Sequence, residues 1–204
     1  MKRHMVKTLF VWCFTLCVWC CPIFADDAPS AGPSTDALFK ESKSPDPKIR
    51  IQLAKRLASN HNTNSFQVLL SLLRDPSLGV SYAAAEAIEI RGDQKFDGEL
   101  IQAIRALPRE NRWPAYRAEK NYPTKRTVEF LLECLQDEIA FYRKQKNFDE
   151  RNSFYIAKSL ETLGKHFPEI QAAKAPEDTA LAAYEKFAID LQRSVKAKVS
   201  RNAK

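Results

Sequence analysis

Cysteine is nearly absent from most of this 204-residue chain. Four of its five cysteines lie within the first 21 residues, and only Cys134 follows them. No disulfide can therefore form among residues 22–204, and a domain there must depend on an apolar core. The composition permits one, because 45% of the residues are hydrophobic and 28% are charged, which is typical of a globular protein.

Glycine and histidine are also scarce. The five glycines form no phosphate-binding loop, and beyond residue 4 the chain has only His61 and His166. Neither histidine has the spacing of a metal ligand, and we interpret both as turn residues. Cys134 is flanked by leucines, which favours core packing over a nucleophilic role. We therefore expect no metal, no cofactor and no catalytic residue.

The N-terminus has the pattern of an export signal. Residues 1–7 carry three basic side chains and no acid, and residues 8–25 carry no charge. This pattern predicts a signal peptide over residues 1–25 with cleavage after Ala25, and therefore a periplasmic or secreted protein. Two alternatives remain open: an uncleaved membrane anchor, because 18 apolar residues can just cross a bilayer, and a lipoprotein modified at Cys20 or Cys21.

The flanking segments are polar. Residues 26–35 include no large apolar side chain, which predicts a flexible tether, and residues 199–204 form a basic C-terminal tail. Removal of residues 1–25 takes away three basic residues and no acid, which lowers the net charge from +7 to +4. A charge this small does not indicate a nucleic-acid partner.

Apolar residues between these segments repeat at a fixed offset of 31 residues. Ser44-Pro45 and Asp75-Pro76 mark successive turns at the same offset. The spacing predicts two helices per repeat, for example over residues 48–58 and 65–74. The main apolar series are Leu38, Leu69 and Leu100; Phe39, Leu70 and Ile101; and Leu73 and Ile104.

This pattern resembles short bacterial HEAT repeats, in which Asp-Pro precedes a β-branched residue and an alanine-rich helix that ends at glycine. The best match spans residues 75–93, and the resemblance covers about residues 36–107. It departs at Ser81, where the family commonly has arginine. The matching residues are Asp75, Pro76, Val80, Ala83, Ala84, Ala87, Ile88, Gly92 and Asp93. The resemblance implies an all-α fold, an α-solenoid of antiparallel helix pairs, but it does not choose a function, because HEAT-like proteins include scaffolds, lyases and glycosylases.

Three longer helices are expected beyond the clear repeats. Apolar spacing predicts them over residues 124–142, 150–163 and 177–198, with Gly164 as a left-handed cap after the second. With these helices, the repeat domain extends over residues 36–198. The last helix would close the stack, because terminal repeats need a polar outer face.

One segment departs from the repeat and is the candidate binding site. Residues 108–123 show little helical periodicity, and residues 105–126 carry seven basic side chains and two acids, a local charge of +5. Aromatic and arginine side chains together are typical anchors of protein interfaces. The candidate residues are Arg109, Arg112, Trp113, Tyr116, Arg117 and Tyr122. In the alternative interpretation, Trp113 and Tyr116 fold back to fill a gap between helices.

These observations favour an exported, non-enzymatic binding module that holds a protein partner. One alternative is an enzyme of the HEAT-like type that uses carboxylates such as Asp75, Glu86 or Asp97. Another is a binder of an anionic envelope polymer, which the local charge of residues 105–126 would attract.

Overall fold

The computed structural model describes residues 34–145, 149–167, 170, 174–177 and 180–202. The chain divides into two compact units, Met1–Gly32 and Pro33–Lys204, and every described residue belongs to the second. The expected signal peptide therefore lies outside the described residues, as do residues 26–33 of the tether. Ser34 and Thr35 belong to the folded unit, because the Ser34 side chain accepts a hydrogen bond from the Ala37 amide and caps the first helix.

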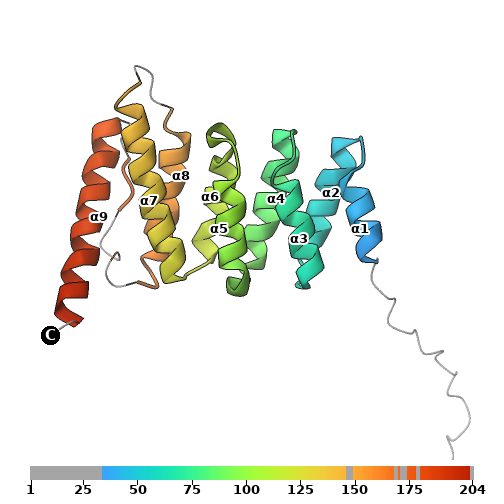
Figure 1. The fold of residues 1–204 in the computed structure, drawn as a ribbon, viewed down its shortest axis with the longest axis horizontal. Coiled ribbons are helices and arrows are strands. Elements are labelled where there is room, and N and C mark those ends of the chain that lie inside the picture. Colours follow the sequence, from blue (N-terminus) through green and yellow to red (C-terminus); the bar gives the residue numbers. More distant parts are fainter. Residues whose placement is uncertain (1–33, 146–148, 168–169, 171–173, 178–179, 203–204) are drawn as a thin grey trace, which may run out of the picture. The chain divides into compact units, whose positions relative to one another are not determined.

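The described residues form α-helices, short 3₁₀ turns and no strand, which confirms the all-α prediction (Figure 1). The helices are α1 (Thr35–Ser42), α2 (Pro47–Leu57), α3 (Thr63–Leu72), α4 (Leu78–Arg91), α5 (Asp97–Arg105), α6 (Trp113–Ala118), α7 (Lys125–Tyr142), α8 (Arg151–Leu163) and α9 (Leu181–Asn202). The 3₁₀ turns are η1 (Gln94–Phe96), η2 (Arg109–Asn111) and η3 (Glu119–Asn121).

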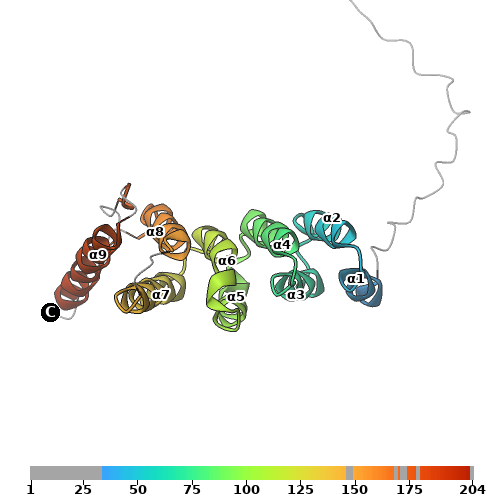
Figure 2. The ribbon, with the colours of Figure 1, turned by 90° about the horizontal axis from the view of Figure 1, so that it is seen from above.

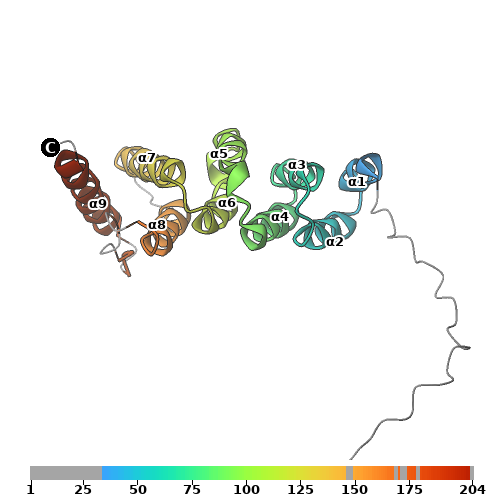
Figure 3. The same cartoon turned by 90° about the horizontal axis from the view of Figure 1, so that it is seen from below.

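The helices of the second unit form two layers. Helices α1, α3, α5 and α7 lie on one side and α2, α4, α6 and α8 on the other (Figures 2 and 3). Within the even-numbered layer, α4 packs against both α2 and α6, and α6 packs against α8. Helix α9 packs against α7 at the C-terminal end. This arrangement is an α-solenoid of helix pairs, as the sequence predicts.

Small residues allow the even-numbered helices to approach closely. Ala83, Ala84 and Ala87 of α4 are all buried, and an alanine lets a neighbouring backbone come nearer than a longer side chain would. Larger side chains fill the space between the layers. Phe66 of α3, for example, is fully buried and stacks on Phe96 with 4.3 Å between ring centroids.

Arginine–carboxylate contacts join successive repeats. Arg50 donates two hydrogen bonds to the Asp75 carboxylate, at 2.7 and 2.8 Å, and Asp75 also accepts the Ser77 amide at 2.9 Å. The predicted Asp75-Pro76 turn therefore comes directly before Ser77, the residue that caps α4. Through Arg50, Asp75 also links α2 to the α3–α4 turn. Bidentate pairs of this kind fix orientation as well as distance.

A second arginine is buried at the end of α4. Arg91 donates to the carbonyl oxygens of Asn60 and Asn62 and to the carboxylate of Asp93. Its guanidinium lies 5.3 Å from the centre of the Phe66 ring. The α2–α3 turn is therefore held to the C-terminal end of the next repeat.

Two expectations about helix ends are wrong. Gly164 has right-handed backbone angles, φ −55° and ψ −23°, because the chain continues in helical turns: the amides of Lys165 and His166 donate to carbonyls three residues earlier. Helix α9 begins at Leu181 instead of residue 177 and continues to Asn202. The basic tail expected at residues 199–204 therefore begins inside the helix.

Gly92 and Gly79 provide a matched test of the α4 geometry. Gly92 has φ 55°, and a Cβ there would lie 3.4 Å from the Asn121 carbonyl oxygen. At Gly79, a Cβ would make ordinary contact with Ile51 at 3.6 Å. We expect Gly92→Ala to lower the free energy of unfolding by about 1–2 kcal/mol because of left-handed strain. Gly79→Ala should leave it equal or higher. Denaturant titration measures both, and an equal effect of the two substitutions would contradict the cap.

Candidate interaction surface

The segment expected to be a loop is folded as part of the solenoid. Residues 109–121 form η2, α6 and η3, and α6 occupies the even-numbered layer between α4 and α8. Pro114 stands in the first turn of α6, where its missing amide is not needed. A six-residue helix is shorter than two turns, so its apolar spacing could not be recognised in the sequence.

Two of the six candidate residues lie in the core. Tyr116 and Tyr122 are each 0% exposed. The Tyr122 hydroxyl donates to the Ile88 carbonyl at 3.3 Å, and the Tyr116 carbonyl accepts the Ser159 hydroxyl at 2.7 Å. Burial raises the pKa of both phenols above the ordinary range. The gap-filling interpretation is therefore correct for Tyr116, and neither tyrosine is available to a partner in this conformation.

Trp113 is the partly buried centre of a line of rings that crosses three helices. Its ring centroid is 5.8 Å from that of Tyr82 on α4 and 5.2 Å from that of Tyr155 on α8. Phe154, which is 37% exposed, meets Tyr155 edge-on at 5.3 Å. We call Tyr82, Trp113, Tyr155 and Phe154 the aromatic row. Sequence reasoning found only Trp113, although Tyr82 precedes it by the repeat offset of 31 residues.

Five of the seven basic side chains of residues 105–126 are already paired with acids of the protein. Arg117 and Lys120 both contact the Glu89 carboxylate, at 2.7 and 2.6 Å. Arg112 donates to the carbonyl oxygens of Leu107 and Arg105 at the end of α5, a favourable place for a cation. The remaining pairs are Arg105–Glu133, Arg109–Glu138 and Arg126–Asp97.

The acids in these pairs come from outside the candidate segment. The local charge of +5 is therefore largely offset by neighbouring helices, and the folded surface gives no support to an anionic polymer as the partner.

Beside Trp113 lies a pocket of about 150 Å³, which we call the Trp113 pocket. Arg109 lies over the Phe141 ring, 4.2 Å from its centre, and its Nη1 is 3.1 Å from Oε1 of Glu138. Asn152 donates to the same Glu138 oxygen at 3.2 Å. Burial raises the pKa of Glu138, and Arg109 acts in the opposite direction. The lining residues are Arg109, Glu110, Trp113, Phe141, Tyr142, Asp149, Arg151 and Asn152.

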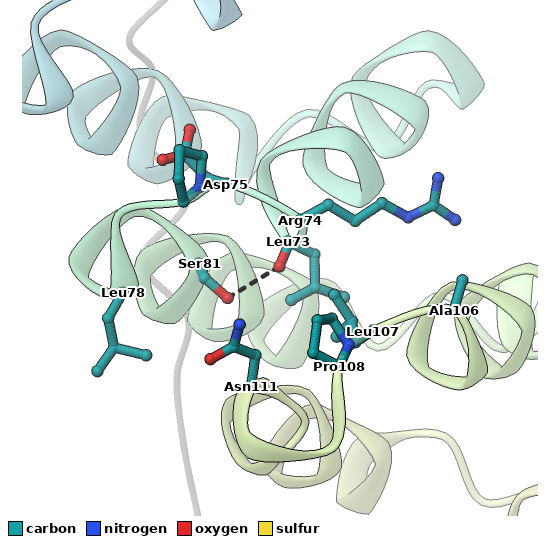
Figure 4. Close-up of a pocket in the computed structure, with 10 residues that line it drawn as sticks. Leu73, Arg74, Asp75, Leu78, Ser81, Ala106, Leu107, Pro108 and Asn111 are labelled. Carbon is teal, nitrogen blue, oxygen red and sulfur yellow. Dashed lines mark hydrogen bonds between the residues drawn. The ribbon is translucent and has the colours of Figure 1, made fainter.

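A second pocket, of about 180 Å³, lies between the start of α4 and the α5–α6 turn (Figure 4). Leu73, Leu107 and Pro108 form much of its wall, and the Ser81 hydroxyl donates to the Leu73 carbonyl at 2.9 Å. Asp75 is its only carboxylate, and Arg50 already binds that group.

The acids of the enzyme hypothesis are not brought together in either described pocket. Glu86 and Asp97 line neither of them, and Asp97 is bound by Thr124 and Arg126. Within the described residues, no group of three or more histidine, cysteine, aspartate or glutamate side chains could hold a metal ion.

The repeat geometry agrees with comparisons to known proteins. The family model of HEAT repeats matches residues 35–106. This match agrees with the resemblance that the sequence shows over about residues 36–107. Helices α1–α5 and both arginine–carboxylate links lie within the matched residues. No curated protein matches the sequence significantly.

Similarity to a solved structure extends beyond the residues that the family model matches. The chain is similar to one in the complex of CpcE and CpcF of phycocyanin lyase from Nostoc sp. PCC7120, with a TM-score of 0.50 and 17% identity. The match covers 84% of this chain and 71% of that chain. At this identity the similarity shows the fold alone.

In the described part of the chain, no helix is both long and apolar enough to span a membrane.

The scarce polar residues of the repeat domain have structural contacts. Cys134 is buried, as expected, and burial raises the pKa of its thiol to about 12. His61 lies in the α2–α3 turn with Nδ1 2.9 Å from Asp93, and His166 lies in the turn after α8. Both histidines are turn residues, as predicted.

Glu119 is a buried carboxyl beside the HEAT repeats. It is 0% exposed and, among the described residues, forms no ion pair. Burial raises the pKa of Glu119 well above its ordinary value; the Thr127 hydroxyl acts against this rise and the Asp97 charge adds to it. The folded protein therefore keeps the proton on Glu119 to a higher pH than the unfolded chain does, and stability falls as the pH rises from the unfolded-state pKa toward the folded one.

Glu119→Gln should remove this pH dependence. The variant should melt at a higher temperature than the wild type near pH 8, and the difference should shrink toward pH 4, where glutamate is protonated in both states. Glu133→Gln is the control, because Arg105 lowers the pKa of that exposed carboxyl. Loss of the Glu133 charge can only reduce stability above acidic pH. A melting difference for Glu119→Gln that is the same at every pH would contradict the buried protonated state.

Tyr116 can be tested separately from Trp113. Tyr116→Ala should lower the free energy of unfolding by about 3–5 kcal/mol, because it empties a fully enclosed aromatic site. Trp113→Ala should cost clearly less, since the ring is only partly buried. Chemical denaturation gives both values, and equal losses would place Trp113 in the core as well.

Proposed function

We propose that this protein is an exported, non-enzymatic HEAT-repeat scaffold that binds a protein partner through the aromatic row and the Trp113 pocket. The observation that carries the proposal is the aromatic row itself: four large rings from α4, α6 and α8 contact one another in a chain, and each remains at least partly exposed. A contiguous exposed apolar patch marks an interaction site in soluble proteins. Tryptophan and tyrosine dominate the binding energy of protein interfaces.

The side chains of the row are held in place before any partner arrives. Arg117 lies 5.3 Å from the centre of the Tyr82 ring, and its guanidinium also donates to the Tyr82 hydroxyl. Trp113 is fixed by near-parallel stacking on Tyr155, with 26° between the ring planes. A preorganised surface loses little conformational entropy on association, which favours affinity.

Export is supported by the N-terminal pattern. Basic residues 1–7 followed by the uncharged residues 8–25 favour a signal peptide, and the repeat domain needs no disulfide in a periplasmic or extracellular setting. The similar solved chain belongs to a phycocyanin lyase complex, but 17% identity does not transfer an activity.

Capture by the tagged protein from its native envelope tests the proposal. The wild type should retain a reproducible partner, and Trp113→Ala should lose it, because a central interface tryptophan typically contributes about 2 kcal/mol or more. Trp113→Phe should retain part of the binding. Ile189→Ala is the control, since Ile189 is an exposed apolar residue on α9, away from the row.

The melting curve of each variant must accompany the capture. Loss of the partner by Trp113→Ala at nearly unchanged melting temperature supports the surface site. A partner that is retained equally by Trp113→Ala and the wild type would show that the aromatic row is not the site.

A further inference from the structure

Two carboxylates near the aromatic row have no ion-pair partner among the described residues. Arg109, Arg117 and Lys120 each contact an acid of the protein. Glu110, which lines the Trp113 pocket, forms no hydrogen bond or ion pair among the described residues, and neither does Glu86. Glu86 follows Tyr82 by four residues on α4, so the two lie on the same helix face.

Among the charged residues that line the Trp113 pocket, Glu110 is the one without an ion-pair partner. Arg109 is balanced by Glu138, and Arg151 is balanced by Asp149, whose oxygens lie 2.5–3.0 Å from its nitrogens. Glu110 remains as an excess negative charge on the exposed rim. An incoming cation would therefore meet one unpaired carboxylate in the lining, while Arg112, outside the lining, donates to backbone carbonyls.

Beneath the pocket, two buried acceptors have no hydrogen bond, and the one donor without a hydrogen bond, Nη1 of Arg109, is in an ion pair with Glu138. Asn152 is 5% exposed, and its Oδ1 has no hydrogen-bond partner, while its Nδ2 donates to Glu138 and to the Arg109 carbonyl. Oε2 of the buried Glu138 likewise receives no hydrogen bond. Unsatisfied buried acceptors favour a ligand that supplies N–H groups.

The walls suit a positive group. Trp113 and Phe141 line the pocket, and Arg109 already lies over the Phe141 ring at 4.2 Å. Lysine and arginine bind over aromatic faces because the ring quadrupole is negative there, and tryptophan is the strongest such partner. Tyr155 and Tyr82 pack against Trp113, so a second cation would bind the part of the ring that these two leave open to the pocket.

We infer that the Trp113 pocket receives a basic side chain, arginine or lysine, from the partner protein, with Glu110 as its counter-charge. This inference rests on the proposed function and adds the chemistry of the partner segment. It differs from the impression given by the basic sequence of residues 105–126, because five of those seven cations pair with acids of the protein and Glu110 stays unpaired at the rim.

The inference can be tested with defined peptides and with Trp113 as the reporter. Trp12→Phe and Trp19→Phe in the full chain leave Trp113 as its only tryptophan. Three capped peptides of the form Gly-Ser-Gly-Xaa-Gly-Xaa-Gly-Ser-Gly carry arginine, citrulline or glutamate at Xaa. Citrulline keeps the shape of arginine without its charge. Fluorescence and the indole NMR signal of Trp113 follow each titration.

We expect saturable binding of the arginine peptide, at least about threefold tighter than the citrulline peptide, as a cation over an aromatic ring requires. Glu110→Gln should weaken it by about two- to fivefold, the range of an exposed ion pair. Glu129→Gln on α7 is the matched control, because Glu129 is exposed in the other layer. Equal binding of all three peptides, tighter binding of the glutamate peptide, or no response of Trp113 would overturn the inference.

Failure of the inference can be separated from failure of the proposed function. If Trp113→Ala loses the envelope partner while Glu110→Gln retains it in full and the peptides bind equally, the scaffold function stands and the basic side chain is wrong. If Trp113→Ala retains the partner, the site itself is wrong, and the inference falls with it.

Discussion

The close approach of α2, α4 and α6 is the contact on which the rest of the structure depends. One helix pair cannot bury its apolar faces alone, so each pair must lie against the next. The alanines of α4 make this possible by removing side-chain volume where the backbones meet. Helix α6 can then lie against α4, and that contact brings Trp113 beside Tyr82. The aromatic row is thus a result of core packing.

The regular part of the fold was predictable, because the same apolar spacing and turn residues recur in successive repeats and each copy supports the interpretation of the others. The offset of 31 residues located α2 and α3 to within two residues of their observed ends, and apolar spacing located α7 and α8 to within one. Each of these helices is long enough to show its periodicity over several turns. The alanine-rich pattern of residues 75–93 specified the packing of α4 in the same way.

The candidate site was only partly predictable. Trp113 and Arg109 lie at the surface pocket, but the burial of Tyr116 and Tyr122 depends on α6, which is too short for a helical pattern to appear. The charges were misleading for another reason. Glu89 and Glu138 lie about 30 residues from the cations they bind. A sum of charges over a short stretch of sequence does not include such contacts between separate helices.

Helix α6 also governs how the solenoid unfolds. Stability in a repeat protein is a sum of the stability of each unit and of its contacts with its neighbours, so cooperativity passes along the stack from one unit to the next. In the even-numbered layer, the contacts that couple α4 to α8 are made by the six-residue helix α6 and the turn η3. Such a short helix has little stability of its own and exists because of its neighbours. When α6 opens, α2 and α4 lose this connection to α8, and the N-terminal repeats can then melt independently of the C-terminal helices.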